Sequence, residues 1–217
     1  MLVERLKAEG MLFNPKVERA MLRVPRELFV PEHLRDSAYD DTPLPIGHGQ
    51  TISAPSIVAY MLSVLDPDVG HRVLEVGAGS GYQAAVLAEI VAPSDEPRER
   101  WGHVWTVEII PELADVARRN LERAGYADRV TVVLGDGSRG LPEHAPYDRI
   151  ILAAAAPGVP DVLKEQLKPG GRLVAPVGDL YAQYLMVVDR LPGGGYRERV
   201  DIPVVFVPLR GEYGWRL

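Results

Sequence analysis

A run of alternating glycines, preceded by an acid, is the most chemically informative feature of this sequence. Gly77, Gly79 and Gly81 follow Glu75 in the order Glu-Val-Gly-Ala-Gly-Ser-Gly. Glycines at the end of a strand let the backbone approach a ligand, and the next helix directs its N-terminus at the same place. The dinucleotide pattern G-x-G-x-x-G is not matched, because Tyr82 stands where its last glycine belongs. The run therefore predicts a ligand site of another kind or, as the alternative, a purely structural tight turn.

Two further acids stand at the ends of the next two predicted strands. A carboxylate such as Glu108 at a strand end can accept both hydroxyls of a ribose, or it can favour the start of the helix that opens at Pro111. Asp136 lies in Gly-Asp-Gly and could equally form an Asp-Gly turn. Ligands of open α/β sheets bind beyond the carboxyl ends of the strands. Three acids at successive strand ends therefore indicate a site more strongly than any one of them.

Strands and helices alternate from Arg72 onward, and this alternation would bring the acids together. We expect strands at residues 72–77, 103–108, 129–136, 147–155 and 172–178, with helices at 80–91, 111–125 and 159–171. This order predicts a doubly wound, mostly parallel Rossmann-like α/β sheet covered on both faces. No helix separates residues 184–190 from 199–209, so these strands should form an antiparallel C-terminal hairpin around the turn at 191–195.

The first part of the chain differs from the rest because prolines interrupt it. Asn14 followed by proline predicts a helix over residues 14–22, and a second helix is expected over 55–65. The intervening stretch 47–56 is rich in glycine and proline and predicts irregular structure. We expect a helical N-terminal appendage and site loop over residues 1–55, with a ligand-binding domain over 56–217, packed together as one compact unit.

Composition narrows the class of protein. The 217 residues are 47% hydrophobic and 25% charged, as in an ordinary globular protein. A net charge of −6 excludes a basic nucleic-acid footprint for the chain as a whole. The absence of cysteine excludes disulfides and thiol catalysis, and the 5 histidines lack metal-ligand spacing. No apolar run approaches the length of a membrane helix, so we expect no membrane partner. We also expect a cytoplasmic monomer with no metal and no nucleic-acid partner.

The glycine run with its preceding acid resembles motif I of the S-adenosylmethionine-dependent methyltransferases. The chain also resembles the protein-L-isoaspartate O-methyltransferase family nearly from end to end. The most specific segment is GQTISAP at residues 49–55, which generic methyltransferases lack. The other matching segments are RVPRELFVPE (23–32), VLEVGAGSGY (73–82), GDG (135–137), APYDRIILAAAAPGVP (145–160), LKPGGRLVAPVG (167–178) and FVPL (206–209).

The resemblance implies a protein repair enzyme whose methyl donor is S-adenosylmethionine, which leaves as S-adenosylhomocysteine. Its acceptor would be the free α-carboxylate of L-isoaspartyl residues in damaged proteins and peptides, and the ester would then form a succinimide spontaneously. A reference α-carboxyl titrates near about 3.3–3.7, so the acceptor is ionised at pH 7 and needs no general base. The enzyme would act mainly by desolvating the reacting groups and holding them in line.

The resemblance also assigns residues. Ser53 matches the family's active-site serine and would hold the non-attacking carboxylate oxygen, although spacing alone would favour it as a helix cap. Asp136 would face the adenine. The residues expected to bind cofactor are Gln50, Thr51, Ser53, Glu75, Gly77, Gly79, Ser80, Gly81, Glu108, Asp136 and Gly137. The residues expected to bind substrate are His48, Ala154, Pro157, Val159, Val207, Pro208 and Leu209.

Three alternative functions remain open from the sequence. A relative in the same superfamily could methylate Asp in a dedicated peptide precursor. A generic small-molecule or RNA methyltransferase is the second alternative, against which the GQTISAP segment and the acidic balance argue. The third is a non-catalytic cofactor-binding module, which methyl transfer to any peptide would exclude.

Overall fold

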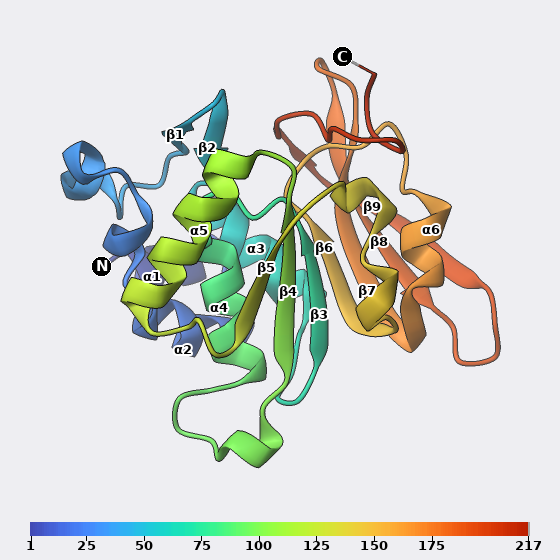
Figure 1. Ribbon diagram of the computed structural model, residues 1–217, viewed down its shortest axis with the longest axis horizontal. Coiled ribbons are helices and arrows are strands. Elements are labelled where there is room, and N and C mark those ends of the chain that lie inside the picture. Colours follow the sequence, from blue (N-terminus) through green and yellow to red (C-terminus); the bar gives the residue numbers. More distant parts are fainter. Residues whose placement is uncertain (217) are drawn as a thin grey trace.

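A seven-stranded sheet forms the centre of the computed structural model, which describes residues 1–216 (Figure 1). The strand order is β5-β4-β3-β6-β7-β8-β9. Neighbours from β5 to β7 run parallel, whereas β8 is antiparallel to both β7 and β9. The bounds are β3 Arg72–Val76, β4 His103–Glu108, β5 Val130–Leu134, β6 Tyr147–Leu152, β7 Leu167–Gly178, β8 Gln183–Arg190 and β9 Tyr196–Val204. The predicted mostly parallel sheet with an antiparallel C-terminal hairpin is confirmed.

Helices lie on both sides of this sheet, with α3, α4 and α5 on one side and α6 on the other (Figure 1). The bounds of these helices are α3 Pro55–Leu65, α4 Tyr82–Val91, α5 Pro111–Ala124 and α6 Asp161–Glu165. Short 3-10 turns complete the layers at η1 Arg26–Phe29, η2 Glu32–Ser37, η3 Arg98–Arg100, η4 Gly137–Arg139 and η5 Pro142–His144. Within residues 1–216 no helix combines the length and apolar character needed to cross a membrane.

Neighbouring residues of the central strands point into two different cores. In β3, Val73 belongs to the core under α3 and α4, whereas Leu74 belongs to the core on the opposite face. The same division separates Val104 from Trp105 in β4. Side chains alternate along a strand, and both faces of this sheet are covered, so apolar residues are favoured on both faces of the central strands. This preference explains why their sequences lack a polar–apolar alternation.

The N-terminal part packs against α3 and α4. It contains α1 (Leu2–Ala8), which the sequence analysis did not predict, and α2 (Pro15–Arg23), whose predicted cap is present because Asn14 Oδ1 accepts a hydrogen bond from the Lys16 amide. Leu6 and Val17 are fully buried in the same core as α3 and α4. The apolar face of this segment is therefore covered by the body of the fold.

Irregular structure was the wrong prediction for residues 47–52. Instead, β1 (Leu44–Gly47) and β2 (Gln50–Ile52) form an antiparallel hairpin. His48 and Gly49 connect the strands with positive φ angles of 56° and 69°. Two successive residues with positive φ reverse the chain with the twist that a two-residue hairpin needs.

The predictions for three C-terminal elements were wrong in their bounds. Helix α6 ends at Glu165, and the residues from Leu167 onward, which were predicted as helix, belong to β7. The Pro-Gly-Gly at 169–171 disfavours a helix, and pairing of Leu167 with Tyr147 adds this stretch to the sheet. The last strand, β9, ends at Val204 rather than residue 209.

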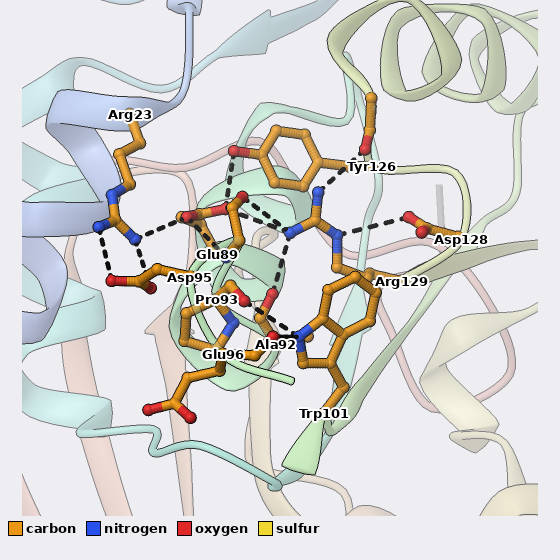
Figure 2. A network of polar contacts seen from close by, with 12 residues as sticks. Arg23, Glu89, Ala92, Pro93, Asp95, Glu96, Trp101, Tyr126, Asp128 and Arg129 are labelled. Carbon is orange, nitrogen blue, oxygen red and sulfur yellow. Dashed lines mark hydrogen bonds and ion pairs between the residues drawn. The ribbon is translucent and has the colours of Figure 1, made fainter. Parts of the chain in front are cut away.

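The polar excursion at residues 92–102 folds over a buried carboxylate (Figure 2). The Ser94 amide and hydroxyl both donate to Glu89, at 3.1 and 2.8 Å. Arg23 of α2 and Arg129 beside β5 donate to the same carboxylate, at 3.1 and 3.3 Å. Tyr126 completes the set at 3.0 Å. One side chain of α4 thereby ties together the excursion, the N-terminal helices and the edge of the sheet.

Candidate active site

The carboxyl ends of the central strands open into a cleft of about 800 Å³. The cleft lies where the strand order reverses, since the chain runs outward from β3 to β5 and returns through β6 on the other side. Its walls come from the loop between β2 and α3, the glycine run, the ends of β4 and β6, and residues 203–210. A reversal of this kind is the usual ligand site of an open α/β sheet.

Most of the predicted site residues line this cleft. Those that do are Gln50, Thr51, Ser53, Glu75, Gly77, Gly79, Ser80, Glu108, Gly137, Ala154, Val207, Pro208 and Leu209. His48, Gly81, Asp136, Pro157 and Val159 are not among the lining residues. His48 lies in the β1–β2 turn, and Pro157 and Val159 lie beyond the point where the chain leaves the cleft after β6.

The three glycines of the run serve two different purposes. Each has a positive φ, at 96° for Gly77, 53° for Gly79 and 89° for Gly81, so a side chain at any of them would be strained. Gly77 and Gly79 line the cleft. A Cβ at Gly81 would lie only 3.2 Å from Leu121 and 3.3 Å from the Ala117 carbonyl oxygen. Gly81 is therefore needed for close packing of the turn on α5 rather than for contact with a ligand.

Glu108 is held by two backbone amides. Its Oε2 accepts from the Gly79 amide at 2.9 Å, and its Oε1 accepts from the Ile110 amide at 3.1 Å. The second contact precedes α5 and corresponds to the helix-start role considered from the sequence. A carboxylate has about four acceptor positions, so each oxygen of Glu108 keeps one for a ligand hydroxyl.

Glu75 lies on the cleft floor and is 0% exposed. It accepts hydrogen bonds from the Thr106 hydroxyl at 2.6 Å and from the side-chain Nε2 of Gln83 at 3.0 Å. Both donors are neutral, and burial raises the pKa of Glu75 to about 7, with a further contribution from the charge of Glu108. Burial therefore controls the charge state of this cleft carboxylate near neutral pH.

Ser53 lies on the loop between β2 and α3, and Arg26 holds its backbone carbonyl. The N-cap of α3 is Ala54, and it makes no side-chain cap bond, so Ser53 does not take the helix-capping role that spacing alone favoured. Arg26 donates from Nη2 to the Ser53 carbonyl oxygen at 3.0 Å and packs its guanidinium over the Tyr82 ring at 4.8 Å. Arg26 is 0% exposed, and burial lowers its pKa.

Asp136 points toward the C-terminal segment of its own chain. Its Oδ1 accepts from the amide and hydroxyl of Ser138, at 3.0 and 2.6 Å, and its Oδ2 accepts from the Glu212 amide at 2.9 Å. A Cβ at Gly211 would lie 2.0 Å from Oδ1, so this approach requires glycine. Asp136 is not among the lining residues of the cleft, whereas the neighbouring Gly137 is, and the contact of Asp136 with an adenine stays a prediction.

One wall of the cleft is an extended segment that follows β9. The Ala155 amide donates to the Val207 carbonyl oxygen, and the Leu209 amide donates to the Ala155 carbonyl oxygen, both at 2.8 Å. These bonds attach residues 207–209 to the end of β6 beside Ala154. The wall is therefore apolar, and it is positioned by main-chain hydrogen bonds.

Comparison with known proteins shows the family of this chain. The family model for protein-L-isoaspartate(D-aspartate) O-methyltransferase matches residues 1–214. A protein-L-isoaspartate O-methyltransferase from Hyperthermus butylicus is 67% identical over 99% of this chain and 89% of its own, and one from Aeropyrum pernix is 57% identical over 99% and 80%. The chain belongs to the protein-L-isoaspartate O-methyltransferase family.

A solved structure of a family member agrees with this assignment. It is described as a beta-aspartate methyltransferase from Plasmodium falciparum in complex with S-adenosyl-L-homocysteine. Its TM-score is 0.84 at 27% identity, over 96% of both chains. These comparisons confirm the predicted family and its methyl donor, S-adenosylmethionine. They also confirm the predicted repair activity, whose substrates are isoaspartyl proteins.

Two polar residues beside the family's cleft were not selected from the sequence. Arg26 lies under Ser53, and Gln183 lines the cleft at the first residue of β8. The sequence does not reveal the role of Arg26, because its target, the Ser53 carbonyl oxygen, lies 27 residues further along the chain. The same holds for Gln183, because Phe206, which makes two of its three hydrogen bonds, lies 23 residues further along the chain.

Proposed function

We propose how the cleft residues divide the work of isoaspartyl methyl transfer. S-adenosylmethionine would lie along the ends of β3, β4 and β5, with its ribose on Glu108 and its adenine beside Gly137. The acceptor carboxylate would approach between Ser53 and the wall formed by residues 207–209. The observation that carries this proposal is that one cleft joins the glycine run, Glu108, Ser53 and this wall.

The cleft residues fit a nucleoside-containing cofactor. Glu108 is fixed by two backbone donors and retains an acceptor position on each oxygen for the two ribose hydroxyls. The backbone of Gly137 lies close to the sheet, since a Cβ there would meet Val76 Cγ1 at 2.7 Å. The positive φ angles at Gly77 and Gly79 keep side chains out of the space beside them.

The chemistry needs positioning more than proton transfer. When bound, S-adenosylmethionine supplies an electrophilic methyl group. The acceptor carboxylate is already ionised, so Ser53 serves as a hydrogen-bond donor to the oxygen that does not attack. Arg26 holds the Ser53 backbone in place from below. Ala154, Val207 and Leu209 exclude water from the acceptor, which strengthens these interactions.

The decisive experiment uses labelled S-adenosylmethionine and two synthetic peptides that differ only in Asp or isoaspartate at one position. We expect a base-labile methyl ester on the isoaspartyl peptide alone. Ester on the Asp peptide would instead indicate the precursor-modifying alternative. Ester on neither peptide, with cofactor still bound, would overturn the substrate assignment.

Substitution of Ser53 tests its role directly. Ser53→Ala removes a hydrogen bond to a charged acceptor, and we expect kcat/KM for the isoaspartyl peptide to fall roughly 10- to 100-fold. Ser56→Ala, three residues along the same stretch, lies outside the cleft lining and should leave the rate unchanged. Equal rates for both variants would exclude a catalytic role for Ser53.

The remaining predictions from the sequence concern partners and location. We propose that the chain acts as a monomer in the cytoplasm, without nucleic-acid or membrane partners. The net charge of −6 supports the independence from nucleic acid. Light scattering on the purified protein tests the monomer, and a second species at twice the mass of 23.8 kDa would contradict it.

A further inference from the structure

Gln183 is a buried polar side chain of the cleft that clamps the main chain of another segment through both atoms of its carboxamide. Its Oε1 accepts from the Phe206 amide at 2.7 Å, and its Nε2 donates to the Phe206 carbonyl oxygen at 3.0 Å. The same Nε2 also donates to the Asp179 carbonyl oxygen at 3.0 Å. Gln183 is 7% exposed and lines the cleft. Every one of its hydrogen bonds goes to backbone.

This arrangement appears where the sheet stops. Val204 is the last residue of β9, and its partner across the ladder is Gln183 itself. Because β8 begins at Gln183, it has no residue to pair with Phe206, whose amide and carbonyl therefore need other partners. The Gln183 carboxamide presents one acceptor and one donor to Phe206, as a neighbouring strand would. The side chain therefore extends the ladder by one residue.

The clamp fixes where the substrate wall leaves the sheet. One residue after Phe206, the carbonyl of Val207 bonds to the Ala155 amide at the end of β6. The chain is thus held by Gln183 at Phe206 and by Ala155 at Val207, two successive residues that both line the cleft. Through Asp179, Gln183 also holds the loop that carries Leu180, which is 74% exposed and lines the cleft.

We propose that Gln183 is a positioning residue for the peptide substrate, acting through the main chain of residues 205–209 and the loop at 179–182. This inference rests on the proposed role of residues 207–209 as the substrate wall. The side-chain hydrogen bonds of Gln183 in the described part of the chain go to Asp179 and Phe206, and none goes to the glycine run or to Glu108. Its loss should therefore weaken use of the peptide and leave cofactor affinity intact.

Two substitutions of matched length test the clamp. Gln183→Glu keeps an acceptor for the Phe206 amide but places a carboxylate against two carbonyl oxygens. Gln183→Met keeps the length and removes all three hydrogen bonds. Because displacement of a binding element by about 1 Å can cost on the order of 100-fold, we expect KM for the isoaspartyl peptide to rise at least about 10-fold in both. The Kd of S-adenosylhomocysteine should change by less than about 2-fold.

Gln166 provides a matched control. It is also 7% exposed, and its carboxamide also clamps main chain, accepting from the Leu141 amide at 2.9 Å and donating to the Arg139 carbonyl oxygen at 3.0 Å. It does not line the cleft. Gln166→Glu should lower the thermal midpoint about as much as Gln183→Glu but leave the peptide KM unchanged. A purely structural role for Gln183 would make the two variants alike.

A third variant separates failure of this inference from failure of the wall assignment. Val207→Asp places a like charge beside the anionic acceptor and should raise the peptide KM. If Val207→Asp raises it and the Gln183 variants do not, the clamp is overturned while the wall stands. If none of them raises it, both are overturned. A parallel loss of S-adenosylhomocysteine affinity in the Gln183 variants would also overturn the clamp.

Discussion

Two glutamates of this protein are almost equally inaccessible to solvent, but their surroundings shift their pKa values in opposite directions. Glu89, on α4 away from the cleft, is 1% exposed, and Glu75, on the cleft floor, is 0% exposed. Burial by itself would raise the pKa of both. At Glu89, hydrogen bonds from Ser94, Tyr126 and Arg23 outweigh burial and lower the pKa, whereas the two neutral donors at Glu75 leave its pKa raised to about 7.

The difference teaches what each region is built for. A buried carboxylate with two arginines at hydrogen-bond distance is a permanent charge, and removal of one partner is costly. A buried carboxylate with neutral donors has a charge that its surroundings can change. Buried carboxylates with neutral donors and shifted pKa values cluster at functional sites. Ionised Glu75 therefore lowers the free energy of unfolding, whereas ionised Glu89 raises it.

The largest expected effect comes from breaking the Glu89 network (Figure 2). Glu89→Gln leaves Arg129, which is 7% exposed, without its buried counter-charge. Breaking a buried pair from one side costs about 3–5 kcal/mol, and we expect a loss of this size in the free energy of unfolding. Urea denaturation at pH 7 measures it. Below the unfolding transition, KM for the isoaspartyl peptide should match the unsubstituted protein.

The network also predicts a pH dependence. Because the pKa of Glu89 is lowered in the folded chain, its contribution is present above its ordinary pKa and is lost as pH falls through the lowered value. Glu89→Gln should therefore cost less at acid pH than at pH 7. A loss below about 1 kcal/mol at pH 7 would mean that the arginines find other partners. It would contradict the view that Glu89 is a stabilising permanent charge.

Glu75→Gln should give an effect of opposite sign. With a folded pKa of about 7 against an ordinary value of 4.5, the folded chain holds a proton that the unfolded chain releases over this range. The free energy of unfolding therefore falls as pH rises from 4.5 to 7, and Glu75→Gln removes that fall. At pH 8 we expect the variant without cofactor to be more stable, by on the order of 3 kcal/mol.

Denaturation of both proteins at pH 5 and pH 8 measures this difference. Glu89→Gln is the natural control, since it should destabilise at pH 8, where Glu75→Gln stabilises. Equal pH slopes for Glu75→Gln and the unsubstituted protein would show that burial does not control this carboxylate. The proposed difference between Glu75 and Glu89 would then be contradicted.

The smallest effect is expected at the rim of the Glu89 network. Asp95 also pairs with Arg23, through two hydrogen bonds of 2.9 and 3.0 Å, but its side chain is 62% exposed. Exposed pairs contribute little because water screens them. Asp95→Asn should lower the denaturation midpoint only slightly, and added salt should erase the difference. A loss comparable to that of Glu89→Gln would mean that the network depends on its exposed half.

Much of the fold could be predicted because it is encoded locally. The apolar runs of β3 and β4, the Asn14 cap and the glycine at the end of α5 each depend on neighbours within a few residues. The bounds that were wrong depend on distant partners instead. Leu167 is a strand residue because Tyr147 pairs with it, and residues 205–209 leave the sheet because their partners are Gln183 and Ala155.

The candidate site divides in the same way. Glu108 and the glycine run were found because their spacing after strands is visible in the chain. Asp136 was found too, but the direction of its carboxylate was not, since Glu212 lies 76 residues away. Arg26 was missed because its target, the Ser53 carbonyl, lies 27 residues further on.

The sequence by itself determined the family, the parallel sheet and the acids at its strand ends, because strand periodicity and motif spacing are properties of adjacent residues. Only the tertiary structure decided which buried charges are paired, since pairing at Glu89 needs four segments to converge within hydrogen-bond distance. It also decided that Gly81 serves helix packing and that Gln183 binds the main chain of Phe206. Such contacts follow from closeness in space, which spacing along the chain does not reveal.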